Sequence, residues 1–274
     1  MTELKALKVG ILGATGAVGE QMMIVLAERN FPVAELRLFG SARSAGTKLA
    51  FKGKEYVVEE ASLERMKGLD LLLGAADNDV AKKFLPDAAK LGVTVVDNSS
   101  AFRLDPEVPL VIPEVNPEDV KWSKGLIANP NCATIIGLTA IAPLHRKAKV
   151  KRLIASTYQA VSGAGKGGID ELEAEVKAPA GTPAPCKVFP YPIAYNLIPQ
   201  IGGFNDEGYT SEEMKMQNEG RKMLHDDNLL VSCTCVRVPI IRSHSEALTI
   251  EFENEISPEE ARELEGCAGR SPLG

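Results

Sequence analysis

The feature that most constrains the fold is an ordered series, near the start of the chain, of an apolar strand, a glycine-rich turn and a helix. Residues 7–12 (LKVGIL) are predicted to form a buried strand and residues 18–29 a helix, with GATGAVG at residues 13–19 between them. In this order, backbone amides at a helix N-terminus can approach a pyrophosphate without an intervening Cβ. The spacing is G-x-x-G-x-x-G and not the commoner G-x-G-x-x-G, so a tight turn without a ligand remains the alternative.

Strand and helix patterns alternate through the first half of the chain. We predict strands at residues 35–39, 70–75, 93–97 and 125–128, a hairpin of residues 48–51 and 56–59, and a helix at residues 79–90 capped by Asn78. Such alternation is typical of α/β proteins with a doubly wound parallel sheet, whose ligands bind at the carboxyl ends of the strands. Arg103 follows one of these ends, so it either binds an anion there or forms a surface ion pair.

The loop after the second strand indicates the kind of dinucleotide. In an NAD site a carboxylate near the end of this strand binds the adenosine ribose hydroxyls, but residues 38–40 are Leu-Phe-Gly. Arg43 follows in a loop that also carries Ser41 and Ser44, and a guanidinium between two hydroxyls suits a 2′-phosphate. We therefore predict NADP(H), with a solvated loop charge as the alternative for Arg43.

A second candidate site is the turn NPNC at residues 129–132, which ends where a helix is predicted at residues 133–148. Cys132 thus lies at a helix N-terminus, where unpaired amides and the positive end of the helix dipole favour the thiolate. Cys132 is therefore either a nucleophile or a small buried core residue.

The next strand and turn supply further candidates. In the strand predicted at residues 150–161, Gln159 is either a residue of an exposed face or a hydrogen-bonding partner of a substrate carbonyl. A glycine-rich turn at residues 162–168 permits close approach of a flat ring and leads into a helix at residues 169–177. Residues 178–200 are rich in proline and predict an extended loop with a subunit-contact or lid role.

Charged residues cluster in the last third of the chain. Glu212 and Lys215 lie three apart on a predicted helix that runs to about residue 224, either as an exposed ion pair or as an inward pair for a zwitterionic or phosphorylated substrate. His244, after a proline break, is the histidine best placed for acid/base work. His145 and His225 lie near predicted helix ends, where the helix dipole explains them without catalysis.

Composition excludes several classes of protein. A chain of 274 residues with 25% charged and 45% hydrophobic residues is typical of a globular protein of two domains. The net charge of −6 predicts no nucleic-acid partner, and no apolar run approaches the length of about 20 residues of a membrane span, so we expect a cytoplasmic protein. The five cysteines lack paired spacing and are accompanied by only three histidines, so they predict neither a disulfide framework nor a metal site. Cys233 and Cys235 share a face of a predicted core strand at residues 229–238.

Taken together, these motifs resemble those of bacterial aspartate-β-semialdehyde dehydrogenases along essentially the whole chain. The segments that carry the resemblance are GATGAVG (13–19), NSSAFR (98–103), NPNC (129–132), QAVSGAG (159–165), EEMK (212–215) and RVPIIRSH (237–244). The resemblance implies an NADP-binding Rossmann domain at residues 1–129 and, at residues 130–274, a catalytic and dimerisation domain of the α+β type found in glyceraldehyde-3-phosphate dehydrogenase. It also implies a homodimer or homotetramer and the reversible conversion of L-aspartate 4-semialdehyde, NADP and phosphate into L-4-aspartyl phosphate and NADPH. This step leads to lysine through diaminopimelate, and to threonine, methionine and isoleucine.

The resemblance also implies roles for single residues. Cys132 matches the nucleophile, His244 the general acid/base and Gln159 the residue that orients the acyl group. Arg237 matches the ligand of the substrate α-carboxylate, Glu212 that of the amino group, and Arg103 with Lys215 the phosphate site. The cofactor-binding positions are Gly13, Thr15, Gly16, Ala17, Val18, Ser41, Arg43, Ser44, Ser162 and Gly163.

Two alternatives remain at this point. The first is an enzyme like N-acetyl-glutamyl-phosphate reductase, in which a glycine stands before the cysteine where this chain has Asn131. The second is a truncated, non-catalytic paralogue that binds NADP, because the family continues for several tens of residues after the helix that begins near residue 258. We accordingly expect the C-terminal part of the catalytic domain to be missing from this chain.

Overall fold

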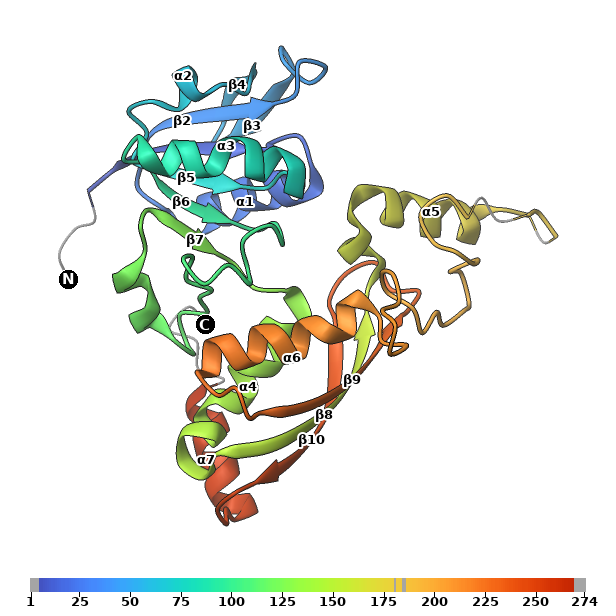
Figure 1. The fold of residues 1–274 in the computed structure, drawn as a ribbon. Coiled ribbons are helices and arrows are strands. Elements are labelled where there is room, and N and C mark those ends of the chain that lie inside the picture. The colour runs from blue at the N-terminus through green and yellow to red at the C-terminus, as the bar shows by residue number, and fades with distance from the viewer. Residues whose placement is uncertain (1–4, 180, 184–185, 269–274) are drawn as a thin grey trace. The chain divides into compact units, whose positions relative to one another are not determined.

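The computed structural model describes residues 5–179, 181–183 and 186–268, and the chain divides into two units (Figure 1). The first unit comprises residues 1–111 and 118–129, and the second comprises residues 112–117 and 130–274. The side chain of Cys267 and the chain end at residues 269–274 lie outside the described part.

The first unit is built on a seven-stranded sheet with strand order β3-β4-β2-β1-β5-β6-β7. Five strands are mutually parallel: β1 (Leu7–Leu12), β2 (Val33–Gly40), β5 (Leu71–Gly74), β6 (Thr94–Asp97) and β7 (Leu126–Ala128). The hairpin of β3 (Lys48–Phe51) and β4 (Lys54–Glu60) extends the sheet through β4, which is parallel to β2. Helices α1 (Ala17–Glu28), α2 (Leu63–Met66) and α3 (Asn78–Lys90) and the 3₁₀ helix η1 (Pro117–Trp122) complete the connections. The predicted α/β fold with a parallel sheet is confirmed.

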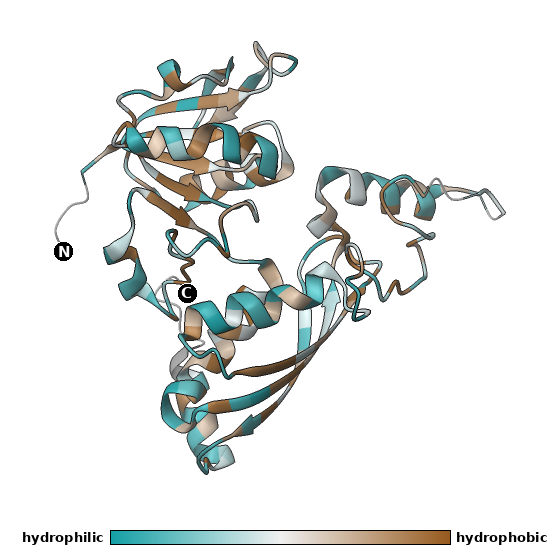
Figure 2. Ribbon diagram, viewed as in Figure 1, coloured by the Kyte–Doolittle hydropathy of each residue, from teal (hydrophilic) through white to brown (hydrophobic). Residues whose placement is uncertain are grey.

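Apolar side chains on both faces of the central strands form the core of this unit. Val9 and Ile11 of β1 and Leu38 of β2 are fully buried on one face, and Leu12 and Phe39 are buried on the other, as expected for a parallel sheet covered by helices. In Figure 2, strands β5 and β7 of the same sheet are brown over most of their length, which marks them as hydrophobic.

The predicted cap of the third helix is wrong by one residue. Asp77 is the N-cap of α3, since its Oδ1 accepts a hydrogen bond from the Val80 amide at 3.0 Å. Asn78 is instead the first helical residue, and its side chain bonds Ser100, which follows β6. A long-range partner therefore decided between two adjacent residues that both suit a cap.

The second unit has a three-stranded sheet in the order β10-β8-β9 (Figure 1). Strand β8 (Val150–Gln159) is parallel to β9 (Leu230–Arg237) and antiparallel to β10 (Ser245–Phe252). Helices α4 (Cys132–Ala148) and α6 (Ser211–Leu224) pack on this sheet, and α7 (Pro258–Ala268) packs on α4. Side chains alternate accordingly along the strands: Leu153 and Ala155 are buried, whereas Ile154 between them is 47% exposed.

The glycine-rich segment after β8 is more helical than predicted. Residues 161–164 form the 3₁₀ helix η2 (Val161–Ala164), and α5 (Gly165–Lys177) begins directly after it, four residues before its predicted start. Gly168 explains the glycine content, because a Cβ there would lie 2.5 Å from the carbonyl oxygen of Val161 and 3.1 Å from the Phe189 ring. Gly168 therefore serves close packing of α5 on its neighbours. The described residues of the following segment, up to residue 200, contain no helix or strand, as predicted.

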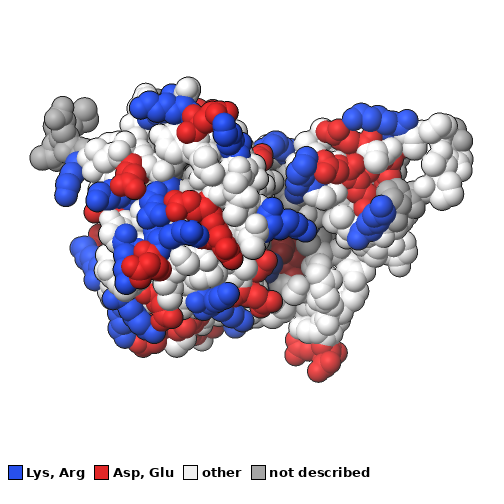
Figure 3. Space-filling model, turned by 90° about the horizontal axis from the view of Figure 1, so that it is seen from above, with Lys and Arg blue, Asp and Glu red and all other residues white. Residues whose placement is uncertain are grey.

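Surface charge agrees with the composition. On the face drawn in Figure 3, blue Lys and Arg atoms are interspersed with red Asp and Glu atoms, and the described residues there form no broad basic area. None of the described helices has the length and apolarity needed to cross a membrane.

Candidate functional sites

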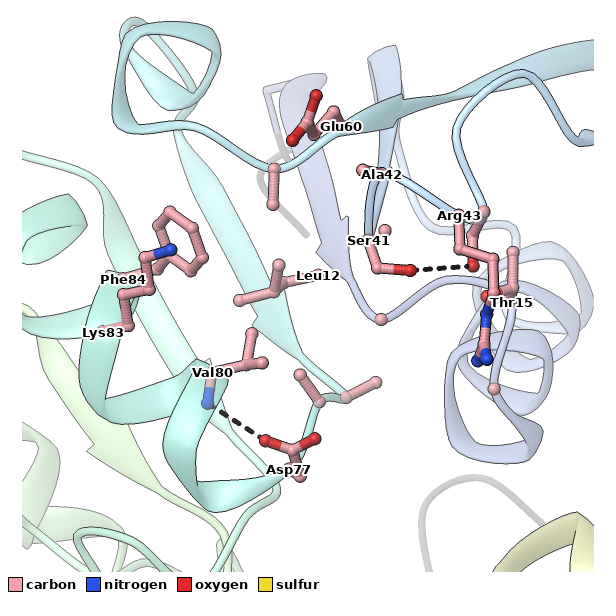
Figure 4. Close-up of a pocket in the computed structure, with 17 residues that line it drawn as sticks. Leu12, Thr15, Ser41, Ala42, Arg43, Glu60, Asp77, Val80, Lys83 and Phe84 are labelled. Atoms are coloured by element: carbon pink, nitrogen blue, oxygen red, sulfur yellow. Dashed lines mark hydrogen bonds between the residues drawn. The ribbon is translucent and has the colours of Figure 1, made fainter.

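The first unit contains a cavity of about 520 Å³ at the carboxyl ends of its central strands (Figure 4). The turn after β1 and the loop after β2 both border it, as do residues 75–77 after β5 and the first half of α3. Of the residues predicted to bind the cofactor, six line this cavity: Gly13, Thr15, Gly16, Ser41, Arg43 and Ser44. Ala17 and Val18 lie in the first turn of α1 and are not among the lining residues.

The glycine turn owes its shape to backbone packing. Gly13 has a φ of +87°, and a Cβ there would lie 2.6 Å from the carbonyl oxygen of Ala75. A Cβ on Gly19 would lie 2.4 Å from the carbonyl oxygen of Gly13, so α1 can approach the turn closely only because residue 19 is glycine. The turn therefore places the start of α1 against the cavity.

The residues of this cavity fit a phosphorylated dinucleotide. Gly16 is the N-cap of α1 and has no side chain to occupy the first amides of the helix, which leaves them to a phosphate. Ser41 and Ser44 lie 3.3 Å apart through their hydroxyl oxygens, next to Arg43, and Figure 4 shows this bond. Two hydroxyls and a guanidinium together suit a phosphate group.

The second unit carries Cys132 as the first residue of α4, as the sequence predicts. Asn131 is the N-cap, and its Oδ1 accepts hydrogen bonds from the amides of Ala133 (3.0 Å) and Thr134 (3.3 Å). Cys132 is exposed, whereas Asn131 is buried. An exposed thiol at the positive end of a helix dipole has the environment of a reactive cysteine and not of a core residue.

His244 lies beside this thiol. Its Nε2 is 3.2 Å from Cys132 Sγ, and its Nδ1 accepts a hydrogen bond from the Ala160 amide at 3.1 Å. That amide favours the tautomer with the proton on Nε2, which points to the sulfur. Burial and, next, the positive charge of Arg237 lower the pKa of His244 below its ordinary value, so the imidazole is neutral at neutral pH.

Glu212 is the centre of a buried network next to the nucleophile. Its Oε1 accepts from the side-chain amides of Asn131 and Gln159, both at 2.9 Å, and its Oε2 accepts from Lys215 Nζ at 2.7 Å. Burial acts to raise the pKa of Glu212, but the charge of Lys215 and these hydrogen bonds outweigh it and hold the pKa below its ordinary value. Of the two readings of Glu212 and Lys215, the structure has the inward-facing pair, since only 8% of the Glu212 side chain is exposed.

Gln159 and Arg237 are direct neighbours on β8 and β9, and both are buried. Gln159 Oε1 accepts from the Thr157 hydroxyl, so both ends of its amide are held. Arg237 Nη1 donates to the Ala160 carbonyl at 2.6 Å. A Cβ on Gly163 would lie 2.8 Å from the same nitrogen, so this glycine makes room for the guanidinium.

The sequence analysis missed one buried acid of this network. Glu219, 2% exposed, accepts a hydrogen bond from the backbone amide of Asn131 at 2.7 Å. It lies two turns after Glu212 on α6, so the two carboxylates hold the backbone and the side chain of the residue before the nucleophile. The sequence feature that could have predicted this role is the i, i+7 spacing of Glu212 and Glu219, which places both acids on one face of the helix.

Arg103 and the remaining candidates lie elsewhere. Arg103, in the first unit, is buried and donates to the carbonyls of Asn98 and Asn129, each at 2.9 Å, so it is not a surface ion pair. Ser162 belongs to η2 of the second unit. His145 accepts from the Val150 amide, and His225 is the C-cap of α6. Cys233 and Cys235 are buried, as predicted, and no cluster of metal-binding side chains occurs among the described residues.

Comparison with known proteins identifies the family. Residues 8–123 match the family model "Semialdehyde dehydrogenase, NAD binding domain", and residues 141–270 match "Semialdehyde dehydrogenase, dimerisation domain". The chain is 53% identical to an aspartate-semialdehyde dehydrogenase of Aquifex aeolicus, with 94% of this chain and 77% of that protein covered. The chain belongs to the aspartate-semialdehyde dehydrogenase family.

Solved structures agree. The crystal structure of aspartate semialdehyde dehydrogenase II of Vibrio cholerae, complexed with ASA, is 43% identical with a TM-score of 0.91, and the match covers 95% of this chain and 79% of that chain. The structure of the Candida albicans enzyme with NADP is 26% identical with a TM-score of 0.71 and matches 95% and 76% of the two chains. The predicted family and activity are confirmed: the chain is an aspartate-semialdehyde dehydrogenase with an NAD(P)-binding Rossmann domain, an oxidoreductase of amino-acid biosynthesis. These comparisons favour neither the reductase of acetylated glutamyl phosphate nor a non-catalytic paralogue.

Proposed function

We propose that this enzyme interconverts L-4-aspartyl phosphate and L-aspartate 4-semialdehyde through a thioester on Cys132, with NADP(H) as its cofactor. The observation that carries the proposal is the 3.2 Å contact between Cys132 Sγ and His244 Nε2, beside buried Gln159, Glu212 and Arg237. A thiol, an imidazole and ligands for both ends of an amino acid thus lie together in one unit.

In the oxidative direction, the Cys132 thiolate adds to the aldehyde carbon and forms a hemithioacetal. The negative charge that develops on the former carbonyl oxygen is stabilised by a hydrogen bond from His244 Nε2–H. When bound, NADP⁺ accepts the hydride that leaves this carbon. Phosphate then attacks the resulting thioester, and the C–S bond breaks to release aspartyl phosphate and the thiolate. The general acid/base role expected of His244 remains a prediction.

Substrate binding is assigned to the charged residues around the nucleophile. Arg237 is proposed to bind the α-carboxylate and Glu212 the amino group, because a zwitterion needs one partner of each charge. Gln159 orients the acyl group. Lys215 and Arg103 are each proposed as a phosphate ligand, and each is tested separately as an alanine variant by its KM for phosphate.

Cofactor choice is assigned to the loop after β2. The preference for NADP over NAD is attributed to Arg43 with Ser41 and Ser44, and the glycine turn with Thr15 and Val18 to contacts with the pyrophosphate. Ser162 and Gly163 are kept as further cofactor positions, with Gly163 also making room for Arg237.

A homodimer is proposed through the open face of the three-stranded sheet. Ile154, Tyr158 and Leu230 are 44–47% exposed there, opposite the face covered by α4 and α6, and the matched dimerisation-domain model spans all three. Ile154→Asp is expected to shift the mass measured by light scattering to that of the monomer. An unchanged mass would contradict this interface.

The reaction is tested by a single-turnover experiment. Without phosphate, aspartate semialdehyde and NADP should give a burst of one NADPH per Cys132 site, because the thioester has no acceptor, and added phosphate should start steady turnover. The same experiment with NAD, and with N-acetylglutamate semialdehyde, should give little product. Steady turnover without phosphate would refute phosphate as the acceptor of the acyl group, and the absence of an acyl adduct on Cys132 after the burst, measured by mass spectrometry, would refute the thioester route.

A further inference from the structure

Two glutamates one turn apart on α5 hold the loop that follows this helix. Glu171 accepts hydrogen bonds from three consecutive amides, those of Lys187 (2.8 Å), Val188 (2.8 Å) and Phe189 (3.1 Å). Glu175 accepts from the amides of Ile193 and Ala194 at 2.8 and 2.7 Å. The described residues of this loop form no helix or strand that would satisfy these amides, so the two carboxylates hold the segments that they bind.

The Glu171 contact is unusual because the residue is only 5% exposed and its carboxylate accepts hydrogen bonds from three backbone amides. A buried carboxylate costs free energy unless its charge is compensated, and three charge-assisted hydrogen bonds provide that compensation. Such an arrangement orders the three residues whose amides it binds.

The last of those residues contacts the active site. The Phe189 ring is 6% exposed and belongs to an apolar cluster with Val161 and Leu172. Its centroid lies 5.9 Å from Cζ of Arg237, within the range of a cation–π interaction. Glu171, Phe189 and Arg237 thus form a continuous series of contacts from α5 to the guanidinium.

Two other contacts restrict Arg237. Nη1 donates to Ala160, and Gly163 approaches the same nitrogen so closely that a Cβ would lie 2.8 Å away. The Phe189 ring is a third support, and the guanidinium carries further N–H donors that can bind a carboxylate in a bidentate manner.

We propose that Glu171 and Phe189 are positioning residues that hold the Arg237 guanidinium in the orientation that receives the α-carboxylate of the substrate. This inference rests on the proposed role of Arg237. On this proposal, the loop after α5 contributes to selectivity for an aldehyde with an α-carboxylate. The loop does so without supplying a nucleophile or an acid/base group.

The experiment compares two matched variants, Glu171→Gln and Glu175→Gln. Both remove a charge from α5 that binds loop amides, but only Glu171 holds the residue that contacts Arg237. We expect Glu171→Gln to raise the KM for aspartate semialdehyde about tenfold with little change in kcat, the effect of weakening hydrogen bonds to a charged group. Glu175→Gln should keep the parent KM.

A second substrate separates positioning from general loss of structure. 3-Aminopropanal lacks the α-carboxylate, so its kcat/KM should be the same for Glu171→Gln and the parent. Phe189→Leu, which removes the ring and keeps an apolar side chain, should reproduce the KM effect and provides the test if Glu171→Gln does not fold. Thermal unfolding of each variant confirms that it is folded.

Arg237→Ala separates the proposed role of Arg237 in binding the carboxylate from the proposed positioning role of Glu171 and Phe189. If it raises the KM for aspartate semialdehyde but Glu171→Gln and Phe189→Leu do not, the positioning role is wrong and the role of Arg237 stands. If both aldehydes lose kcat/KM equally in Glu171→Gln, the role of Glu171 is structural only. If Arg237→Ala leaves this KM unchanged, the carboxylate assignment fails, and the positioning role fails with it.

Discussion

The two sites of this molecule differ in what forms them, which is mainly backbone in the first unit and side chains in the second. The cavity of the first unit is formed by a turn of consecutive residues, in which glycines at 13 and 19 allow backbone atoms to approach one another. The cluster of the second unit is formed by side chains that come from separate elements. Asn131 and Gln159 donate hydrogen bonds to Glu212, His244 contacts Cys132, and the charge of Arg237 acts on His244.

This difference determines how each site responds to substitution. A backbone site depends on the absence of a Cβ at particular points, and its exposed side chains adjust selectivity. A network of buried charges depends on every partner, because removing one leaves another without compensation. The four predictions below test that contrast.

The largest effect is expected for Cys132→Ala. Loss of the nucleophile should lower kcat by at least about a thousandfold, since the thioester route has no substitute. NADPH binding should persist, because the cavity lies in the other unit, and titration by fluorescence measures it. Residual turnover within about tenfold of the parent would remove Cys132 from the mechanism.

Gly19→Ala tests the backbone site. Its Cβ would lie 2.4 Å from a carbonyl oxygen, so we expect a loss of about 3 kcal/mol in unfolding free energy and weak NADPH binding. Gly16→Ala is the matched control, because its Cβ would meet the same carbonyl oxygen at 3.4 Å. Denaturant unfolding measures the stability of both variants. Equal stability of Gly19→Ala and Gly16→Ala would show that the close approach at residue 19 is unimportant.

Glu246 tests what happens when a buried carboxylate is not compensated. Among the described residues, neither of its buried side-chain oxygens has a hydrogen-bond partner. Burial raises the pKa of Glu246 from 4.5 to about 7. The native state therefore binds a proton that the unfolded state has released between these pH values, and stability is lost as the pH rises from about 4.5 to about 7. Between pH 5 and pH 8, Glu246→Gln should gain about 2 kcal/mol in unfolding free energy relative to the parent. A difference that stays constant with pH would show that Glu246 is ionised in the native protein.

The smallest effect is expected for Arg43→Glu, at an exposed residue of the cavity. Loss of a phosphate ligand and gain of a like charge should weaken NADPH binding about tenfold and leave NADH binding near the parent value. Parallel titrations with both cofactors measure the change. Equal weakening of NADPH and NADH binding would show that Arg43 supports the fold of this loop and does not select between the cofactors.

Much of the first unit was predictable because its information is local. The strand, glycine turn and helix are consecutive, and the positions of β1 and of the β3–β4 hairpin agree with the predictions. The cap at Asp77 was missed because Ser100, which draws Asn78 away, is distant in sequence. The extra helical residues at the start of α5 were missed because Gly168 is required by packing on Val161 and Phe189 and not by a turn.

The sequence by itself determined the chemical groups of this protein and the local geometry of two of them: Cys132 at the start of α4 and the glycine turn before α1. Only the tertiary structure decided that Gln159 pairs with Arg237 across β8 and β9, that Glu212 points inward, and that Glu219 and Glu171 take part. The physical reason is that a residue's propensity depends on its sequence neighbours, whereas a buried charge is tolerated only where distant partners compensate it.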